Sequence, residues 1–141
     1  MDVKMDVAAL TEFLGTAFPQ VADDFVVEAI APMQATIRLK VSDAHLRPGG
    51  TVSGPSMFAL ADVSVYLATL AMIGPQALAV TTNISMDFMR KPASGVDLVS
   101  DTRLLKLGRQ LAVGDCLIRS VGETDPVARA SMTYAIPPAR G

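Results

Sequence analysis

One acidic side chain stands alone in a long apolar stretch of the chain. Between Arg47 and Asp87 the only charged residue is Asp62, and the surrounding residues 56–73 are almost wholly apolar. Burying an unpaired carboxylate is costly, and such groups concentrate at functional sites. The sequence therefore marks Asp62 as a candidate functional residue. The alternative is a structural aspartate that is bonded to backbone amides or to an arginine.

A loop rich in glycine runs directly into the same stretch. It reads RPGGTVSGP, residues 47–55, and its Gly54 precedes a proline that suits the first turn of a helix. Backbone amides at a helix N-terminus can hold an anion or a developing oxyanion. Glycines before helices are often simple turns, so the loop alone is weak evidence for an anion-binding site. Together with the nearby Asp62, it favours a functional site.

The spacing of these two features indicates how they could cooperate. Gly54 and Asp62 are eight residues apart, which corresponds to about 12 Å along a helix. One chain therefore cannot place both groups against the same carbonyl carbon. Two antiparallel helices across a symmetric interface would bring the Asp62 of one subunit to the helix start of the other. We therefore expect a homodimer with shared sites, and we expect the dimers to assemble into a homotetramer.

The hydrophobic pattern predicts the elements that position these residues. An apolar stripe at helical spacing predicts an N-terminal helix over residues 7–18, and the long apolar stretch predicts a central helix over 54–73 that the rest of the fold encloses. Period-two alternation, clearest in ATIRLKV, predicts strands. These strands are expected at residues 24–30, 33–41, 77–90, 96–107, 110–122 and 127–136.

The order of these elements indicates a fold class. The first two strands can pair around the turn at Ala31 and Pro32, and the last four are expected to form a meander. A helix, two strands, a buried helix and a meander are typical of an α+β hotdog fold, in which an antiparallel sheet curls around a central helix. We expect a single domain over residues 1–141, with its N-terminal helix inside residues 1–20.

Composition narrows the classes of function. The 141 residues are 50% hydrophobic and 18% charged, with a formal net charge of −2. No overall basic field exists to hold nucleic acid. One cysteine and one histidine exclude a disulfide framework and a metal site built from clustered Cys and His. Residues 57–74 reach the lower length limit for a membrane span, but they contain Asp62 and fit a buried helix better. The N-terminus, with Asp2 and Asp6, does not read as a secretory signal, so we expect a cytoplasmic protein.

Several segments together resemble a known family. GTVSGPSMFALAD, FMRKPASG, KLGR and ASMTYAIP, within residues 25–137, are similar to the hotdog acyl-CoA thioesterases of the phenylacetate-degradation type. The resemblance implies hydrolysis of a small or medium acyl-CoA thioester with no cofactor beyond the coenzyme A (CoA) of the substrate. It implies that Asp62 is the catalytic carboxylate, which acts as a general base on water or as a nucleophile. It also implies that the Gly54 amide polarises the thioester oxygen. Thr81 falls near the position that holds the nucleophilic water in some relatives, with Thr82 as its alternative.

The loop departs from the family pattern. That pattern usually has an asparagine six residues before a His-Gly-Gly triplet, where this chain has Arg47 and the triplet Ser53-Gly54-Pro55. Ser53 can donate one hydrogen bond but cannot become cationic. Arg47 could grip a substrate oxygen or phosphate, or could pair with Asp62 across the dimer. These departures leave a second hypothesis, a protein that binds acyl-CoA or another apolar ligand with negligible turnover.

Basic residues after the central helix have two interpretations. The resemblance implies that Arg90, Lys91 and Arg109 meet the phosphates of CoA, whereas cations on strand ends and turns are commonly a solvated rim. His45 lies eight residues before Ser53, and we expect it to be a solvated loop residue. Cys116 lies in the middle of an expected strand, so we expect it to be a core residue.

Overall fold

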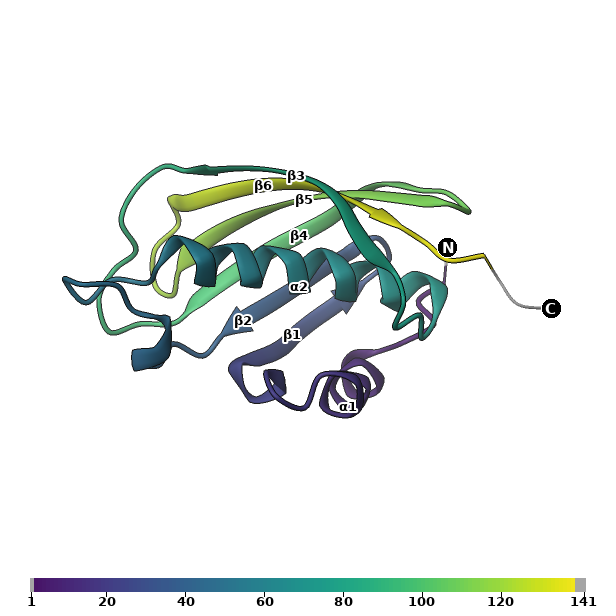
Figure 1. The fold of residues 1–141 in the computed structure, drawn as a ribbon, viewed down its shortest axis with the longest axis horizontal. Helices are drawn as coiled ribbons and strands as arrows, with labels where there is room; N and C mark the ends of the chain where they lie inside the picture. Colours follow the sequence, from purple (N-terminus) through teal and green to yellow (C-terminus); the bar gives the residue numbers. More distant parts are fainter. Residues whose placement is uncertain (1, 139–141) are drawn as a thin grey trace.

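Six strands form one antiparallel sheet that curves around a long helix (Figure 1). The computed structural model describes residues 2–138. Its helices are α1 (Val7–Ala17) and α2 (Gly54–Ile73), with short 3-10 turns at Ala22–Asp24 and Asp43–His45. Its strands are β1 (Phe25–Ala31), β2 (Gln34–Leu39), β3 (Val80–Phe88), β4 (Leu98–Leu107), β5 (Leu111–Ser120) and β6 (Pro126–Ala135). This arrangement confirms the expected α+β hotdog fold.

The order of the strands corrects one expectation. The sheet runs β1-β2-β4-β5-β6-β3, so β3 lies at the far edge beside β6 and does not begin a four-strand meander. The connections between β4, β5 and β6, residues 108–110 and 121–125, have hairpin length, whereas β3 and β4 are joined by residues 89–97. This longer connection contains Pro92 and Gly95 and passes the end of the sheet. Its first amides, those of Met89 and Arg90, donate to the carbonyl of Val127 at the start of β6.

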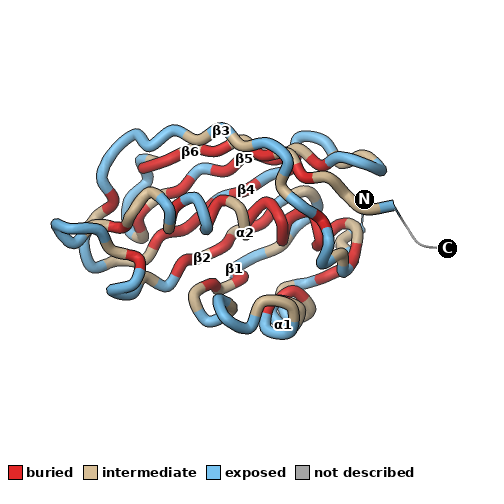
Figure 2. The backbone as a smooth tube through the Cα atoms, viewed as in Figure 1, coloured by how far each residue is buried: buried red, intermediate tan, exposed pale blue. Residues whose placement is uncertain are grey.

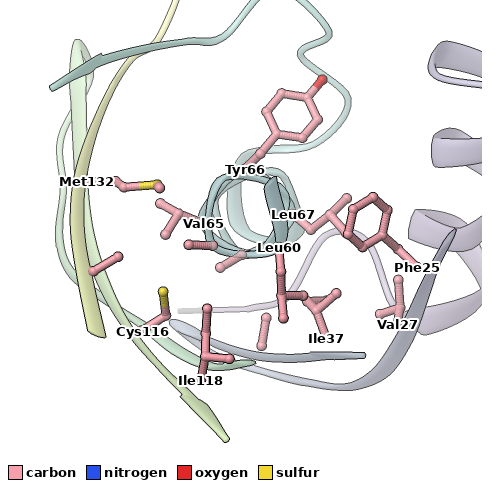
Figure 3. Close-up of a cluster of buried hydrophobic side chains, with 14 of the residues drawn as sticks. Phe25, Val27, Ile37, Leu60, Val65, Tyr66, Leu67, Cys116, Ile118 and Met132 are labelled. Atoms are coloured by element: carbon pink, nitrogen blue, oxygen red, sulfur yellow. The ribbon is translucent and has the colours of Figure 1, made fainter. Parts of the chain in front are cut away.

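Helix α2 occupies the residues expected for the central helix. Ser53 is its N-cap, Pro55 lies in its first turn, and Gly74 ends it with a φ of 92° that favours glycine. Figure 3 shows Leu60 and Val65 of α2 facing the sheet. The helix is long and apolar enough to cross a membrane, but 67% of its apolar window is buried inside the protein. It is therefore the central helix of the core.

The first half of α2 and the edge strand β3 remain partly uncovered. Buried residues concentrate in the second half of α2, where residues 64–72 are buried on every side, and on the inner face of the sheet (Figure 2). On α2 itself, however, Phe58 is 40% exposed, so the enclosure expected for this helix is incomplete. The edge strand β3 also exposes apolar side chains, with Val80 at 55% and Phe88 at 54%. An uncovered apolar strand edge is a feature that proteins usually pair or protect.

Candidate active site

Asp62 of α2 is held by two hydroxyl groups. Thr81 donates a hydrogen bond from its Oγ1 to Asp62 Oδ1 at 2.6 Å. The hydroxyl of Tyr134 contacts the same Oδ1 and also lies 2.8 Å from the backbone carbonyl oxygen of Asp62. The carboxylate is half-buried, and among the described residues 2–138 it has no arginine partner. This environment differs from that of a structural aspartate bonded to backbone amides or to an arginine.

A β-bulge selects which threonine reaches Asp62. Thr81 stands directly opposite Tyr134 in the β3–β6 ladder, and the register shifts between Thr81 and Asn83. A bulge re-aims the side chains beside it. The shift leaves Thr82 exposed, with its hydroxyl 3.3 Å from the carbonyl of Thr133. The structure therefore brings Thr81, and not Thr82, to the carboxylate.

Tyr134 is a site residue that the sequence analysis did not single out. Its side chain points inward from β6, where alternation places it on the same face as the buried Met132 and Ala130. Burial, followed by the charge of Asp62, raises the pKa of Tyr134 far above its usual range. The hydroxyl therefore stays protonated and remains a donor. The period-two pattern of ASMTYAIP could have placed this tyrosine on the inner face, but its contact with Asp62 joins β6 to α2 across 72 positions of sequence, which the pattern does not pair.

Gly54 begins α2 beside a cavity of about 440 Å³. Its neighbour Ser53 caps the helix by accepting a hydrogen bond from the Ser56 amide at 3.3 Å. The Gly54 amide has no acceptor inside the helix, because the first amides of any helix lack one. A Cβ at Gly54 would lie 3.4 Å from the ring of Phe88. The loop thus presents a free amide at the positive end of the α2 dipole.

Three of the cations named from the sequence meet at this cavity. Its walls include Arg47, Arg90 and Lys91 together with Gly54, and apolar side chains that include Met57 and Phe88 complete them. Arg47 follows the short 3-10 turn at Asp43–His45, whereas the other two cations come from the connection after β3. The fold therefore combines a helix N-terminus with a group of positive charges.

Arg109 does not join this group within one chain. It lies in the turn between β4 and β5, next to Gln110, whose carbonyl accepts the amide of Ile136 after the end of β6. Arg90, by contrast, lies beside Val127 at the start of β6. The two arginines are thus at opposite ends of the sheet.

The loop histidine has a structural position that contradicts the expectation. His45 is only 8% exposed, so the expectation of a solvated residue is wrong. Its Nδ1 accepts the amide of Ser42 at 2.9 Å, and its Nε2 lies 3.5 Å from Asp24. Its backbone carbonyl accepts the amide of Ser53 at 2.8 Å. His45 therefore anchors the loop that leads into α2, which explains its burial.

Cys116 is a core residue, as expected. It is 2% exposed and faces the interior from β5 (Figure 3). Burial raises the pKa of its thiol to about 11. The thiolate needed for nucleophilic attack is therefore scarce near neutral pH.

Residues 49–127 match the model of the thioesterase superfamily. A Pseudomonas aeruginosa protein named as a candidate esterase is 32% identical over 107 residues, which are 76% of this chain and 78% of that protein. The crystal structure of a candidate thioesterase from Silicibacter sp. TM1040 is 59% identical, with a TM-score of 0.92 over 98% of this chain and 96% of that one.

Two further solved structures are more distant. A variant of the phenylacetic acid degradation protein of Thermus thermophilus is 28% identical, with a TM-score of 0.72 over 84% of this chain and 99% of that chain. A hypothetical thioesterase from Streptococcus pneumoniae, solved with coenzyme A, is 20% identical and shares the fold, with a TM-score of 0.79 over 94% of this chain and 100% of that chain. These matches confirm the resemblance found in the sequence.

Proposed function

This chain belongs to the thioesterase superfamily, and from that membership we propose that it hydrolyses a small or medium acyl-CoA to the free acid and CoA. The observation that carries the proposal is the half-buried Asp62, which Thr81 and Tyr134 hold in the middle of α2. A carboxylate fixed in this way can take a proton from water or attack a carbonyl carbon itself.

The proposed reaction divides the work between two groups. Asp62 removes a proton from water as the water oxygen attacks the thioester carbon, or its own oxygen attacks first and water then releases the acid. The carbonyl oxygen becomes an oxyanion, which the Gly54 amide and the α2 dipole stabilise. When the carbon–sulfur bond breaks, the sulfur leaves as CoA thiolate and takes up a proton. We propose that no cofactor beyond the substrate takes part, so a chelator should leave turnover unchanged.

The two groups work together only if two subunits share a site. Gly54 and Asp62 are eight positions apart in α2, a distance of about 12 Å along the helix. The free edge of β3 and the exposed Phe58, Val80 and Phe88 supply an apolar surface that a second copy can cover. We propose a homodimer in which Asp62 of one subunit faces the helix start of the other, with dimers assembled as tetramers in the cytoplasm.

The positive charges around the cavity support the proposal that the protein binds the CoA part of its substrate. Arg47, Arg90 and Lys91 stand beside the Gly54 amide and can pair with phosphate groups. The fold neighbour solved with CoA is consistent with this assignment. Arg47 at this position fits contact with substrate, and an ion pair with Asp62 across the dimer remains its alternative. Arg109 does not line this cavity in the single chain, so the cavity does not support the expected contact of Arg109 with CoA.

Removing one cation of the cavity should weaken binding of CoA esters. Arg90→Ala or Lys91→Ala is expected to raise the KM for an acyl-CoA about tenfold, because a hydrogen bond to a charged group contributes about 1.5 kcal/mol. The KM for the matching acyl-pantetheine, which lacks the nucleotide phosphates, should stay unchanged. Steady-state kinetics with both esters tests this.

Arg103→Ala is the matched control for the cavity cations. Arg103 pairs with Asp115 on the outer face of the sheet, so its removal should alter neither KM. If Arg90→Ala or Lys91→Ala raised the KM equally for both esters, or did not raise the KM for the acyl-CoA, a phosphate contact at that residue would be excluded.

A direct assay separates the enzyme from the binding protein. Release of free thiol is measured with a panel of short, long, aliphatic and aromatic acyl-CoA esters. Turnover above the uncatalysed rate supports the thioesterase and ranks its substrates. If no ester is hydrolysed while several raise the melting temperature, the protein is a ligand-binding member of the superfamily and the proposed hydrolysis is wrong.

A further inference from the structure

The two oxygens of the Asp62 carboxylate have different surroundings. Both hydroxyl donors, Thr81 and Tyr134, contact Oδ1. No group in residues 2–138 donates a hydrogen bond to Oδ2. The lone pairs of Oδ1 are therefore engaged, and those of Oδ2 remain available.

Tyr134 also ties the side chain of Asp62 to its own backbone. The tyrosine hydroxyl lies between Oδ1 and the Asp62 carbonyl, at 2.8 Å from the latter. A group that contacts both atoms restricts rotation of the carboxylate relative to α2. Thr81 restricts it further from the neighbouring strand, because Thr81 and Tyr134 are paired across the β3–β6 ladder. The carboxylate is thus fixed from two strands and from its own helix.

Tyr134 is itself rigidly held. It is 3% exposed, and its ring centroid lies 6.0 Å from that of Tyr66. Burial and the adjacent Asp62 charge raise its pKa, so the hydroxyl acts as a donor and not as a base. A buried donor with fixed geometry can orient a carboxylate without touching the substrate.

We propose that Tyr134 is a positioning residue, which together with Thr81 engages Oδ1 and so makes Oδ2 the oxygen of Asp62 that acts in hydrolysis. The inference rests on the proposed thioesterase function and goes beyond it, since it assigns a role to a residue of β6 and distinguishes the two carboxylate oxygens. Misplacing a catalytic group by about 1 Å can cost about a hundredfold in rate. Loss of the Tyr134 hydroxyl should therefore lower kcat and leave substrate binding intact.

The test is Tyr134→Phe, with Tyr66→Phe as the matched control. Both changes remove a buried phenol hydroxyl from neighbouring rings, but the Tyr66 hydroxyl has no hydrogen-bond partner in the described chain. We expect Tyr134→Phe to lower kcat about 10- to 100-fold with KM changed less than about threefold. Tyr66→Phe should keep the kcat of the wild type. Melting temperatures of both variants show whether the fold is retained.

A second pair of variants covers the case in which Tyr134→Phe fails to fold. Thr81→Val removes the other donor to Oδ1 and should lower kcat in the same way, whereas Thr81→Ser keeps a hydroxyl and should restore most of it. If the wild type hydrolyses acyl-CoA and both Tyr134→Phe and Thr81→Val keep its kcat, the positioning role is wrong. A wild type without any turnover overturns the proposed function itself, and the positioning role with it.

Discussion

Replacing Asp62 with asparagine is expected to lower kcat about a thousandfold, which is within the range of a lost general base. Asparagine has nearly the same shape as aspartate. Its amide oxygen can accept the hydrogen bonds of Thr81 and Tyr134 that now reach Oδ1. The amide nitrogen then occupies the place of Oδ2, where it cannot accept a proton or attack a carbonyl. The variant should therefore fold, bind acyl-CoA and fail to hydrolyse it.

The measurement is thiol release by wild type and Asp62→Asn side by side, together with acyl-CoA binding by both proteins. Asp101→Asn is the control, because Asp101 lies on the outer face of the sheet in an ion pair with Arg119. Such exposed pairs contribute only about 0–1 kcal/mol to stability. A variant Asp62→Asn that retained the rate of Asp101→Asn would show that Asp62 is not the catalytic carboxylate.

Replacing Gly54 with proline is the second change with a large expected effect. Proline removes the one amide hydrogen that the proposal assigns to the oxyanion. Loss of one such donor typically lowers kcat about 100- to 1,000-fold. The backbone tolerates the change on its N-terminal side, because Ser53 already has the extended conformation that precedes proline, with φ −74° and ψ 156°.

Gly54→Ala is the matched control for this proline. Both variants place a Cβ next to the ring of Phe88, at 3.4 Å, and both carry the steric cost of a Cβ before Pro55. Only alanine keeps the amide hydrogen. Steady-state kinetics should therefore show a large loss of kcat for proline and little loss for alanine. Similar losses in both variants would mean that crowding at Phe88, and not the amide, controls the rate.

Most helices and strands could be predicted from the sequence, because the signals that define them act between residues that are close in the chain. The span of α2 is marked by an N-cap serine, a proline in the first turn and a terminal glycine, all of which act within a few residues. Six strands were expected within a few residues of their observed ends. The position of β3 was not predictable in this way, because pairing with β6 is a long-range choice that alternation does not encode. Only the length of the connection at residues 89–97 indicates that β3 and β4 are not a hairpin.

The site shows the same division between local and long-range information. Asp62 and Gly54 were identified because one is an isolated charge and the other precedes a helix. The selection of Thr81 over Thr82 depends on a bulge in the ladder, which neither residue type reveals. Tyr134 was missed because its contact with Asp62 joins residues that are 72 positions apart. His45 was expected to be solvated because its loop is polar. Its contacts with Ser42 and Asp24, which accompany its burial, are seen only in the folded structure.

The most direct test of a shared site is complementation between two inactive variants. Asp62→Asn and Gly54→Pro are combined in equal amounts by refolding, and thiol release is compared with that of each variant alone. If Asp62 of one subunit works with Gly54 of the other, a mixed dimer has one intact site, and the mixture should recover about a quarter of the wild-type rate. If the mixture is as inactive as its components, each site lies within one chain and the proposed dimeric mechanism is wrong.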